Sequence, residues 1–217
     1  MKIHYYSGWF DEALPASYLE SLRKDITNKK SLVLVWGCWG GDELIDFVKD
    51  SWLKPGGIDF DEIHLVDNRT TKEEGHKLIR EASALLLLGG DDVLQSKFFE
   101  EYELAAPIKE SKANLIMGFS AGAINMPSIC INFENETTTL YDGLGLDEFC
   151  YVPYFYLDKE ASLSRYREGV IENDLLPLSQ NIDVYVTTPE SFIRIEAGAV
   201  KAFGDAWLIS DSAISKI

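Results

Sequence analysis

A serine between two glycines is the part of this sequence best suited to chemistry. Ser120 lies in the segment GFSAG (118–122), which follows an apolar run and precedes residues compatible with a helix. In this pattern a sharp strand-to-helix turn exposes the serine hydroxyl, and Gly118 and Gly122 relieve the crowding at the turn. Such a serine can attack a carbonyl carbon, and the backbone N–H of Ala121 can then stabilise the oxyanion. A plain turn is the alternative, because glycine and serine are common in turns.

A second pair of glycines, Gly89 and Gly90, ends the apolar run ALLLLGGDD (84–92). If this strand is a neighbour of the strand before Ser120, an amide of the pair could supply the second donor to the oxyanion. An ordinary turn that ends a strand is again the alternative.

The surrounding pattern predicts the elements that must hold this serine. Short apolar runs typical of strands alternate with stretches of helical spacing. The runs are 31–36, 61–68, 83–91 and 114–119, and the helical stretches are 44–53, 72–82 and 98–109. Crossovers of this length are right-handed and cover both faces of a parallel sheet. We therefore predict an α/β three-layer sandwich with a mainly parallel sheet, in which Ser120 lies at the carboxyl edge where sites collect.

The C-terminal part has a different pattern. Residues 183–188, 191–204 and 206–209 contain short strands, and the tight turn EAG (196–198) predicts a hairpin rather than a crossover. We expect an antiparallel edge on the parallel sheet. No internal repeat and no Pro/Gly/Ser-rich linker marks a boundary, so residues 1–217 are predicted to form a single domain.

The composition restricts the classes of partner. The net charge of −16 would repel nucleic acid and anionic membranes. No apolar run approaches the roughly 20 residues needed to span a bilayer, and residues 1–15 lack the apolar core of a secretion signal. We therefore expect a soluble, cytoplasmic protein with no nucleic acid or membrane partner. Cys38, Cys130 and Cys150 are too widely spaced for a zinc site or a disulfide framework, and we expect neither a metal nor a cofactor.

The other groups that could do chemistry are expected to be structural. The segment VWGCWGGDE (35–43) matches neither glycine-rich phosphate-binding pattern. Its Cys38 follows a different strand from Ser120 and has no histidine beside it. The three histidines, His4, His64 and His76, lie within predicted strands or a helix rather than in a loop beside the serine.

Four segments together resemble one known family. LLLLGGDD (85–92) followed by IMGFSAGAIN (116–125) resembles the dipeptidase E and cyanophycinase family of serine peptidases. YDGLGLDEFCYVPYFYLD (141–158) resembles that family's Gly-Leu-Gly-Leu run and the Pro-His-Tyr that follows it, and 191–209 resembles its terminal hairpin. The resemblance implies the class I glutamine amidotransferase-like fold, which is flavodoxin-like.

The resemblance also implies an activity and its residues. Ser120 would be the nucleophile, with Gly89 or Gly90 and Ala121 as oxyanion donors, acting on short peptides that often carry an acidic residue such as Asp. The family's acidic third member would lie in the segment NFENET (132–137), where the candidates are Glu134, Asn135 and Glu136. Residues that grip an acidic substrate side chain would correspond to Arg165 and Arg167, for which a solvated helix face is the alternative.

One position departs from the family pattern. Tyr154 stands where the family has its catalytic histidine, and no histidine follows His76. An imidazole with a pKa near 6.5 can accept a serine proton near pH 7, whereas a phenol with a pKa near 10 is poorly suited.

Two hypotheses for the function result. In the first, the protein is a serine peptidase-like hydrolase in which Tyr154, a water or a remote group accepts the proton. In the second, it is a pseudoenzyme that binds a ligand or a partner. Both predict a small peptide or amino-acid-like ligand and a monomer or homodimer.

Overall fold

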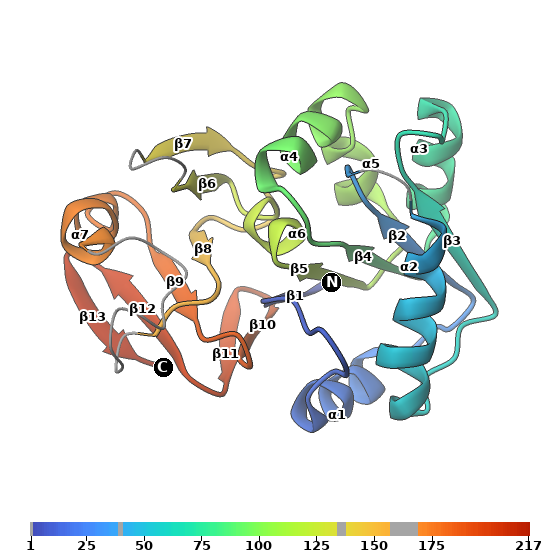
Figure 1. Cartoon of the computed structure of the whole chain (residues 1–217), viewed down its shortest axis with the longest axis horizontal. Coiled ribbons are helices and arrows are strands. Elements are labelled where there is room, and N and C mark those ends of the chain that lie inside the picture. Colours follow the sequence, from blue (N-terminus) through green and yellow to red (C-terminus); the bar gives the residue numbers. More distant parts are fainter. Residues whose placement is uncertain (1, 39–40, 134–137, 157–168) are drawn as a thin grey trace.

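A seven-stranded sheet forms the centre of the protein. The computed structural model describes residues 2–38, 41–133, 138–156 and 169–217. The order of the strands is β11-β10-β1-β5-β4-β2-β3 (Figure 1). Their bounds are β1 Ile3–Ser7, β2 Ser31–Val35, β3 Glu62–Val66, β4 Ala84–Leu87, β5 Leu115–Phe119, β10 Phe192–Glu196 and β11 Ala199–Phe203. The five strands from β1 to β3 in this order are parallel, whereas β10 and β11 form the antiparallel hairpin predicted from the EAG turn.

Helices cover both faces of this sheet because the strand side chains alternate between two apolar clusters. In β2, Leu32 and Leu34 belong to one cluster and Val33 and Val35 to the other. The first cluster contains residues of α1 (Ala16–Asp25) and of η1 (Val48–Leu53), the π-helical segment that continues α2 (Asp42–Phe47) and runs into η2 (Lys54–Gly56). The second contains residues of α3 (Lys72–Glu81), α4 (Asp92–Glu101), α5 (Ala105–Glu110) and α6 (Ala121–Ile124). The predicted α/β fold with three layers is therefore confirmed.

The single helix predicted around residues 98–109 is wrong. The chain instead forms α4 and α5, with Glu103 between them in the left-handed region at φ 53°. The turn is closed by the N–H of Leu104, which donates to Phe99 O at 2.9 Å. Pro107 is tolerated in the first turn of α5 because the N–H that it lacks would have no partner within the helix there.

A second sheet lies beside the first and was not predicted as a separate sheet. Its order is β13-β12-β9-β8, and it packs against η5 (Ile171–Leu175) and α7 (Leu176–Leu178) through a third apolar cluster. Its bounds are β8 Cys150–Val152, β9 Val184–Thr187, β12 Ala206–Ser210 and β13 Ala213–Lys216. The strands expected at 183–188 and 206–209 thus exist, but they pair here rather than at the edge of the main sheet.

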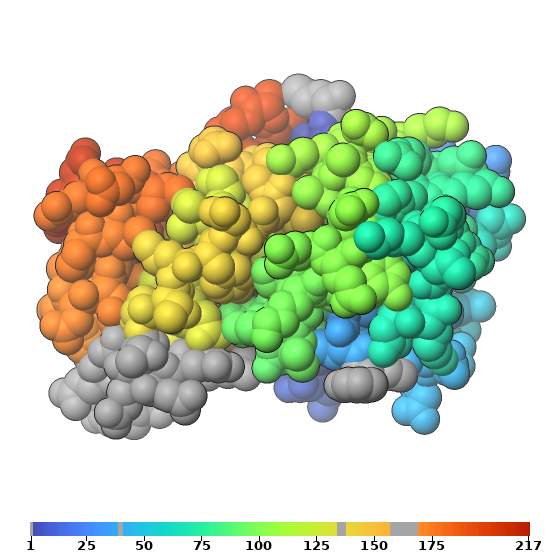
Figure 2. Space-filling model, turned by 90° about the horizontal axis from the view of Figure 1, so that it is seen from above, coloured from blue at the N-terminus to red at the C-terminus, as the bar shows by residue number. Residues whose placement is uncertain are grey.

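A two-stranded sheet, β6 (Ile129–Asn132) with β7 (Thr139–Asp142), links the two larger parts. Figure 2 shows this segment in yellow between the green helices of the main sheet and the orange C-terminal segment. Within the residues that the structure describes, no helix combines the length and apolar character needed to cross a membrane.

Candidate active site

Ser120 occupies a strained turn at the carboxyl end of β5. Its backbone has φ 51° and ψ −117°, outside the regions that a residue with a side chain normally adopts. Its N–H donates to Ser7 O at 2.9 Å, and its carbonyl accepts from Ile124 N–H at 2.9 Å. Such strain typically costs about 1–3 kcal/mol and persists only where the surroundings impose it. A strained strand-to-helix turn of this kind is the backbone geometry typical of a nucleophile elbow.

The two glycines of the elbow are required by close packing. A Cβ at Gly118 would lie 2.6 Å from Ala123 Cα, and one at Gly122 would overlap Leu87 O of β4. Helix α6 therefore packs directly on the backbone of the sheet, which explains glycine at both positions.

The glycine pair after β4 lies beside the serine, because β4 and β5 are neighbours. A Cβ at Gly89 would be 3.1 Å from Ser120 Cβ. Trp36 Nε1–H donates to Gly89 O at 2.8 Å, and the peptide bond that follows is trans, so the N–H of Gly90 points away from the Trp36 indole. Gly90 itself has φ 137°, a conformation that suits glycine.

Tyr154 follows β8 and reaches the same place from the second sheet. Its hydroxyl oxygen accepts from the N–H of Trp9 at 2.6 Å. Its ring lies on Gly8, where a Cβ would be 2.8 Å from Tyr154 Cε1. Tyr154 has φ 65°, so its backbone is strained as well. The structure thus brings Tyr154 together with Ser120 and the glycine pair.

Two cavities meet at Ser120, and both are lined by Gly90, Ser120 and Tyr154. The first, of about 290 Å³, is the polar cavity, whose further lining includes Asp91, Asp92 and Asn132. The second, of about 460 Å³, is the aromatic cavity, whose further lining includes Trp9, Trp36, Leu44 and Leu88. Pockets of this size accommodate small ligands.

The polar cavity owes its charge to the start of α4. Asp91 Oδ1 caps this helix by accepting from Leu94 N–H at 2.7 Å. Asp92 accepts from Asn132 Nδ2 with both carboxylate oxygens, at 3.1 and 3.0 Å, and from the Tyr141 hydroxyl at 3.3 Å. These carboxylates were not predicted as site residues, although both directly follow the glycine pair in the sequence.

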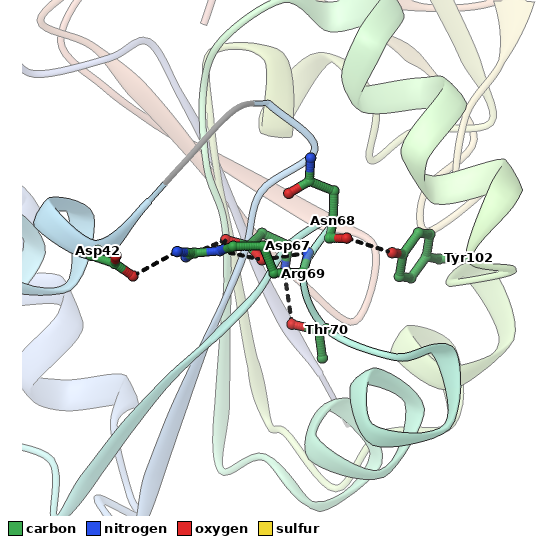
Figure 3. Close-up of polar contacts among 6 residues, drawn as sticks. All are labelled: Asp42, Asp67, Asn68, Arg69, Thr70 and Tyr102. Carbon is green, nitrogen blue, oxygen red and sulfur yellow. Dashed lines mark hydrogen bonds and ion pairs between the residues drawn. The ribbon is translucent and has the colours of Figure 1, made fainter.

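A polar cluster at the end of β3 contacts the start of α2, which carries Leu44 of the aromatic cavity. Figure 3 shows Arg69 between Asp67 and Asp42, with nitrogen to oxygen distances of 2.6 Å and 2.9 Å. Asp67 is 2% exposed and anchors the guanidinium, whereas Asp42 is largely exposed and gains little from the ion pair. Tyr102 donates to Asn68 O at 3.2 Å on the other side of the same loop.

The histidines have other partners, as the sequence suggested. His4 Nδ1 lies 2.6 Å from Asp147 Oδ2, and His64 Nε2 lies 3.2 Å from Glu62 Oε2. His76 Nε2 is 2.7 Å from Tyr102 O. Within the described residues no histidine lines either cavity, and no hydrogen bond reaches Ser120 Oγ.

The remaining predicted residues divide into two groups. Cys38 lies beside the glycine pair, since a Cβ at Gly90 would be 2.6 Å from its Sγ, and burial raises the pKa of its thiol. Glu134, Asn135, Glu136, Arg165 and Arg167 lie outside the described residues, so their predicted roles stay predictions.

The fold and the site define an α/β protein with a mainly parallel sheet and a strained serine at its carboxyl edge. The model of peptidase family S51 matches residues 41–200, and the chain belongs to this family of peptidase-like hydrolases. The match confirms the resemblance to the dipeptidase E family.

Comparison with solved structures supports the same fold. A peptidase from an acI-B1 Actinobacterium superposes with a TM-score of 0.69 at 16% identity, with 100% of this chain and 94% of that chain covered. A protein described as a candidate peptidase E from Listeria monocytogenes EGD-e superposes with a TM-score of 0.62 at 15% identity, with 94% and 98% covered. No curated protein sequence matches the chain.

Proposed function

We propose that the protein is a serine-type hydrolase that cleaves short peptides through Ser120. The observation that carries this proposal is the strained backbone of Ser120 at the junction of the two cavities. A serine held in this way presents its hydroxyl to a bound carbonyl group, and family membership supports peptide bonds as the target.

The chemistry is acyl transfer in two steps. Ser120 Oγ forms a bond to the scissile carbonyl carbon while its proton passes to a base, and the C–N bond then breaks as the amine leaves with a proton. Water hydrolyses the acyl-enzyme and regenerates the hydroxyl. The amides of Gly90 and Ala121, with Gly89 as the alternative to Gly90, are proposed to hold the oxyanion. Each such donor typically contributes about 10²–10³ in rate.

Tyr154 is proposed to act at the position of the family histidine. It lies at the junction of both cavities, and its hydroxyl oxygen is held by the Trp9 amide. Tyr154 in its phenolate form, or a water bound beside it, would receive the proton from Ser120. An N–H donated to the phenol oxygen favours the charged phenolate, which helps that transfer.

The other assignments are proposals from the family resemblance. Glu134 or Glu136 would be the acidic member of the site, and Arg165 and Arg167 would bind a substrate carboxylate such as that of an Asp-containing peptide. The ligand would be a small peptide or amino-acid-like molecule, bound by a cytoplasmic monomer or homodimer.

A fluorophosphonate probe tests the nucleophile, with intact mass as the readout. We expect stoichiometric labelling of the wild-type protein and none of Ser120→Ala. Ser96→Ala on α4 is the matched control and should label like the wild type. Labelling that survives in Ser120→Ala, or no labelling of the wild type, would contradict the proposal.

The second candidate function is a pseudoenzyme that binds a ligand. It is favoured by one observation, that no hydrogen bond reaches Ser120 Oγ among the described residues. Catalytic hydrogen bonds are often long before substrate binds, so this geometry is compatible with both candidates. An unlabelled wild-type protein that still binds peptides would favour the pseudoenzyme.

A further inference from the structure

A buried glutamine joins the two chain segments that lie against the glycine pair. Gln95 is the fourth residue of α4 and is 0% exposed. Helix side chains lean toward the N-terminus of their helix, so its carboxamide reaches back to the ends of β2 and β4. Its Oε1 accepts from the N–H of Gly37 at 2.5 Å. Its Nε2 donates over longer distances, to Leu88 O at 3.3 Å and to Val35 O at 3.4 Å. One side chain therefore ties two neighbouring strand ends together.

The contacts of Gln95 and Trp36 orient two successive peptide planes. Gln95 bonds to the carbonyl of Leu88, which belongs to the peptide plane between Leu88 and Gly89. Trp36 bonds to the carbonyl of Gly89, which lies in the same plane as the N–H of Gly90. Glycine has the widest choice of backbone conformations, so the direction of this N–H depends on such contacts from outside the loop.

Gln95 also holds the segment that carries Trp36. Gly37 directly follows Trp36, and its N–H donates to the Gln95 side chain. A Cβ at Gly37 would lie 2.9 Å from Gln95 Oε1 and 2.7 Å from Phe98 Cβ, so this segment packs directly on α4. Gln95 thus acts on the glycine pair in two ways, directly through Leu88 and indirectly through the position of Trp36.

The side chain of Gln95 is not part of the cavity walls. It is fully buried and is not among the described residues that line either the polar or the aromatic cavity. A ligand in these cavities therefore does not contact it. Any effect of Gln95 on a reaction at Ser120 must pass through the glycine pair.

We propose that Gln95 is a positioning residue, which holds the glycine pair so that the N–H of Gly90 faces the oxyanion formed at Ser120. The inference rests on the proposed function, because only that function forms an oxyanion. The positioning itself is a property of the free protein, so it can also be measured without a reaction.

The first test is Gln95→Met, which keeps a long, unbranched side chain but removes both the donor and the acceptor. The full chain is labelled with increasing concentrations of a fluorophosphonate probe, which gives the maximal rate and the half-saturating concentration. A misdirected N–H weakens the transition state rather than binding of the probe. The maximal rate should therefore fall about tenfold or more, while the half-saturating concentration should stay within about twofold.

Phe99→Leu is the matched control on the same helix. Phe99 lies one turn beyond Gln95, is buried in the second apolar cluster and lines neither of the two cavities. The substitution removes buried apolar volume, so the temperature of unfolding should fall. The maximal labelling rate should not change. This control separates a general loss of stability from a change at the glycine pair.

Exchange of the Trp36 indole proton with water reads the loop without any reaction. Its signal in the ¹H–¹⁵N NMR spectrum is assigned by its loss in Trp36→Phe. Gln95→Met should speed this exchange about tenfold or more, because the hydrogen bond to Gly89 O opens more often when the Gly37 segment is released. Phe99→Leu should leave the exchange unchanged.

Gly37→Ala replaces Gln95→Met if that variant fails to fold in a thermal unfolding assay. The added methyl group would press on Gln95 Oε1 and move the Trp36 segment away from α4. We expect the same two effects, a lower maximal labelling rate and faster exchange of the Trp36 indole proton.

An unchanged maximal labelling rate or unchanged Trp36 exchange in the folded variant would overturn the inference. Labelling of the wild type separates this failure from that of the proposed function. A labelled wild type with an unaffected variant refutes the role of Gln95 alone. Faster Trp36 exchange in the variant without any labelling of the wild type supports the positioning of the loop and refutes the hydrolase.

Discussion

Substituting Gly122 with alanine tests whether the elbow depends on direct contact between α6 and β4. The added methyl group would overlap Leu87 O and lie 2.8 Å from Leu88 O. Both are backbone atoms of a buried strand or its end, so they cannot move aside as a flexible side chain would. Helix α6 must shift instead, and with it Ser120 and the Ala121 amide.

The expected loss of stability of Gly122→Ala follows from overpacking, which costs about 1–3 kcal/mol in a well-packed core. Contact with two backbone carbonyls places Gly122→Ala at the upper end, about 3 kcal/mol. For a slope of about 5 kcal/mol per molar guanidinium chloride, the unfolding midpoint should fall by about 0.6 M. Because native proteins are stable by about 5–15 kcal/mol, the variant should still fold, but its fluorophosphonate labelling should be slowed strongly.

Gly57→Ala is the control for this prediction. Gly57 has φ 64° and no atom within 4 Å of an added Cβ, so alanine there meets strain but no clash. We expect a loss of about 1 kcal/mol and unchanged labelling. If Gly122→Ala matched Gly57→Ala in both stability and labelling, direct packing of α6 on β4 would not be what holds the elbow.

Three further predictions concern the site and its surroundings. Tyr154→His should raise the rate of fluorophosphonate labelling at pH 7.5, about 10²-fold if imidazole acts as general base, and Ser120→Ala in the same chain should abolish it; no gain would count against Tyr154 standing at the base position. Trp36→Phe keeps an aromatic ring but removes the donor to Gly89 O, so labelling should slow about tenfold with the fold intact by circular dichroism; an unchanged rate would show that this bond does not orient the loop. Burial raises the pKa of the Cys150 thiol to about 12, so the unfolded chain ionises first as pH rises. Stability should therefore fall by up to about 1.4 kcal/mol per pH unit between about pH 9 and about pH 12, and Cys150→Ala should flatten this slope in denaturant titrations at successive pH values.

The strands of the main sheet could be predicted from the sequence because each of them can be recognised from its own short run of residues. The runs at 31–36, 83–91 and 114–119 are apolar on both faces, which is the pattern of a buried parallel strand. The run at 61–68 also contains Glu62 and His64, and it forms the edge strand β3. The elbow was also predictable, since GFSAG fixes both the turn and the position of Ser120. The pairing of the C-terminal strands was not predicted correctly, because it depends on contacts between segments far apart in the sequence. Strands at 183–188 and 206–209 were predicted from the sequence pattern, but not that they pair with each other in a separate sheet, to which β8, of only three residues, also belongs.

The aromatic cavity could not have been predicted for the same reason. Trp9 and Trp36 follow β1 and β2, and these strands are separated in the sheet by β5 and β4. Only the strand order places the two indoles on either side of the glycine pair. A list of motifs along the chain does not show this order, whereas Asp91 and Asp92 directly follow the glycine pair in the sequence and could have been predicted as site residues from that position.

The strain at the elbow favours the hydrolase over the pseudoenzyme. Ser120 and Tyr154 both have positive φ angles without being glycine, and each such backbone typically costs about 1–3 kcal/mol. A site that only bound a peptide would not need a strained serine at the junction of the two cavities, and glycine at residue 120 would relieve the strain. Holding a reactive serine in a strained turn is useful if a bound ligand places a carbonyl group beside it. The strained serine beside the glycine pair therefore favours the proposed hydrolase over the pseudoenzyme, and the fluorophosphonate experiment decides between them.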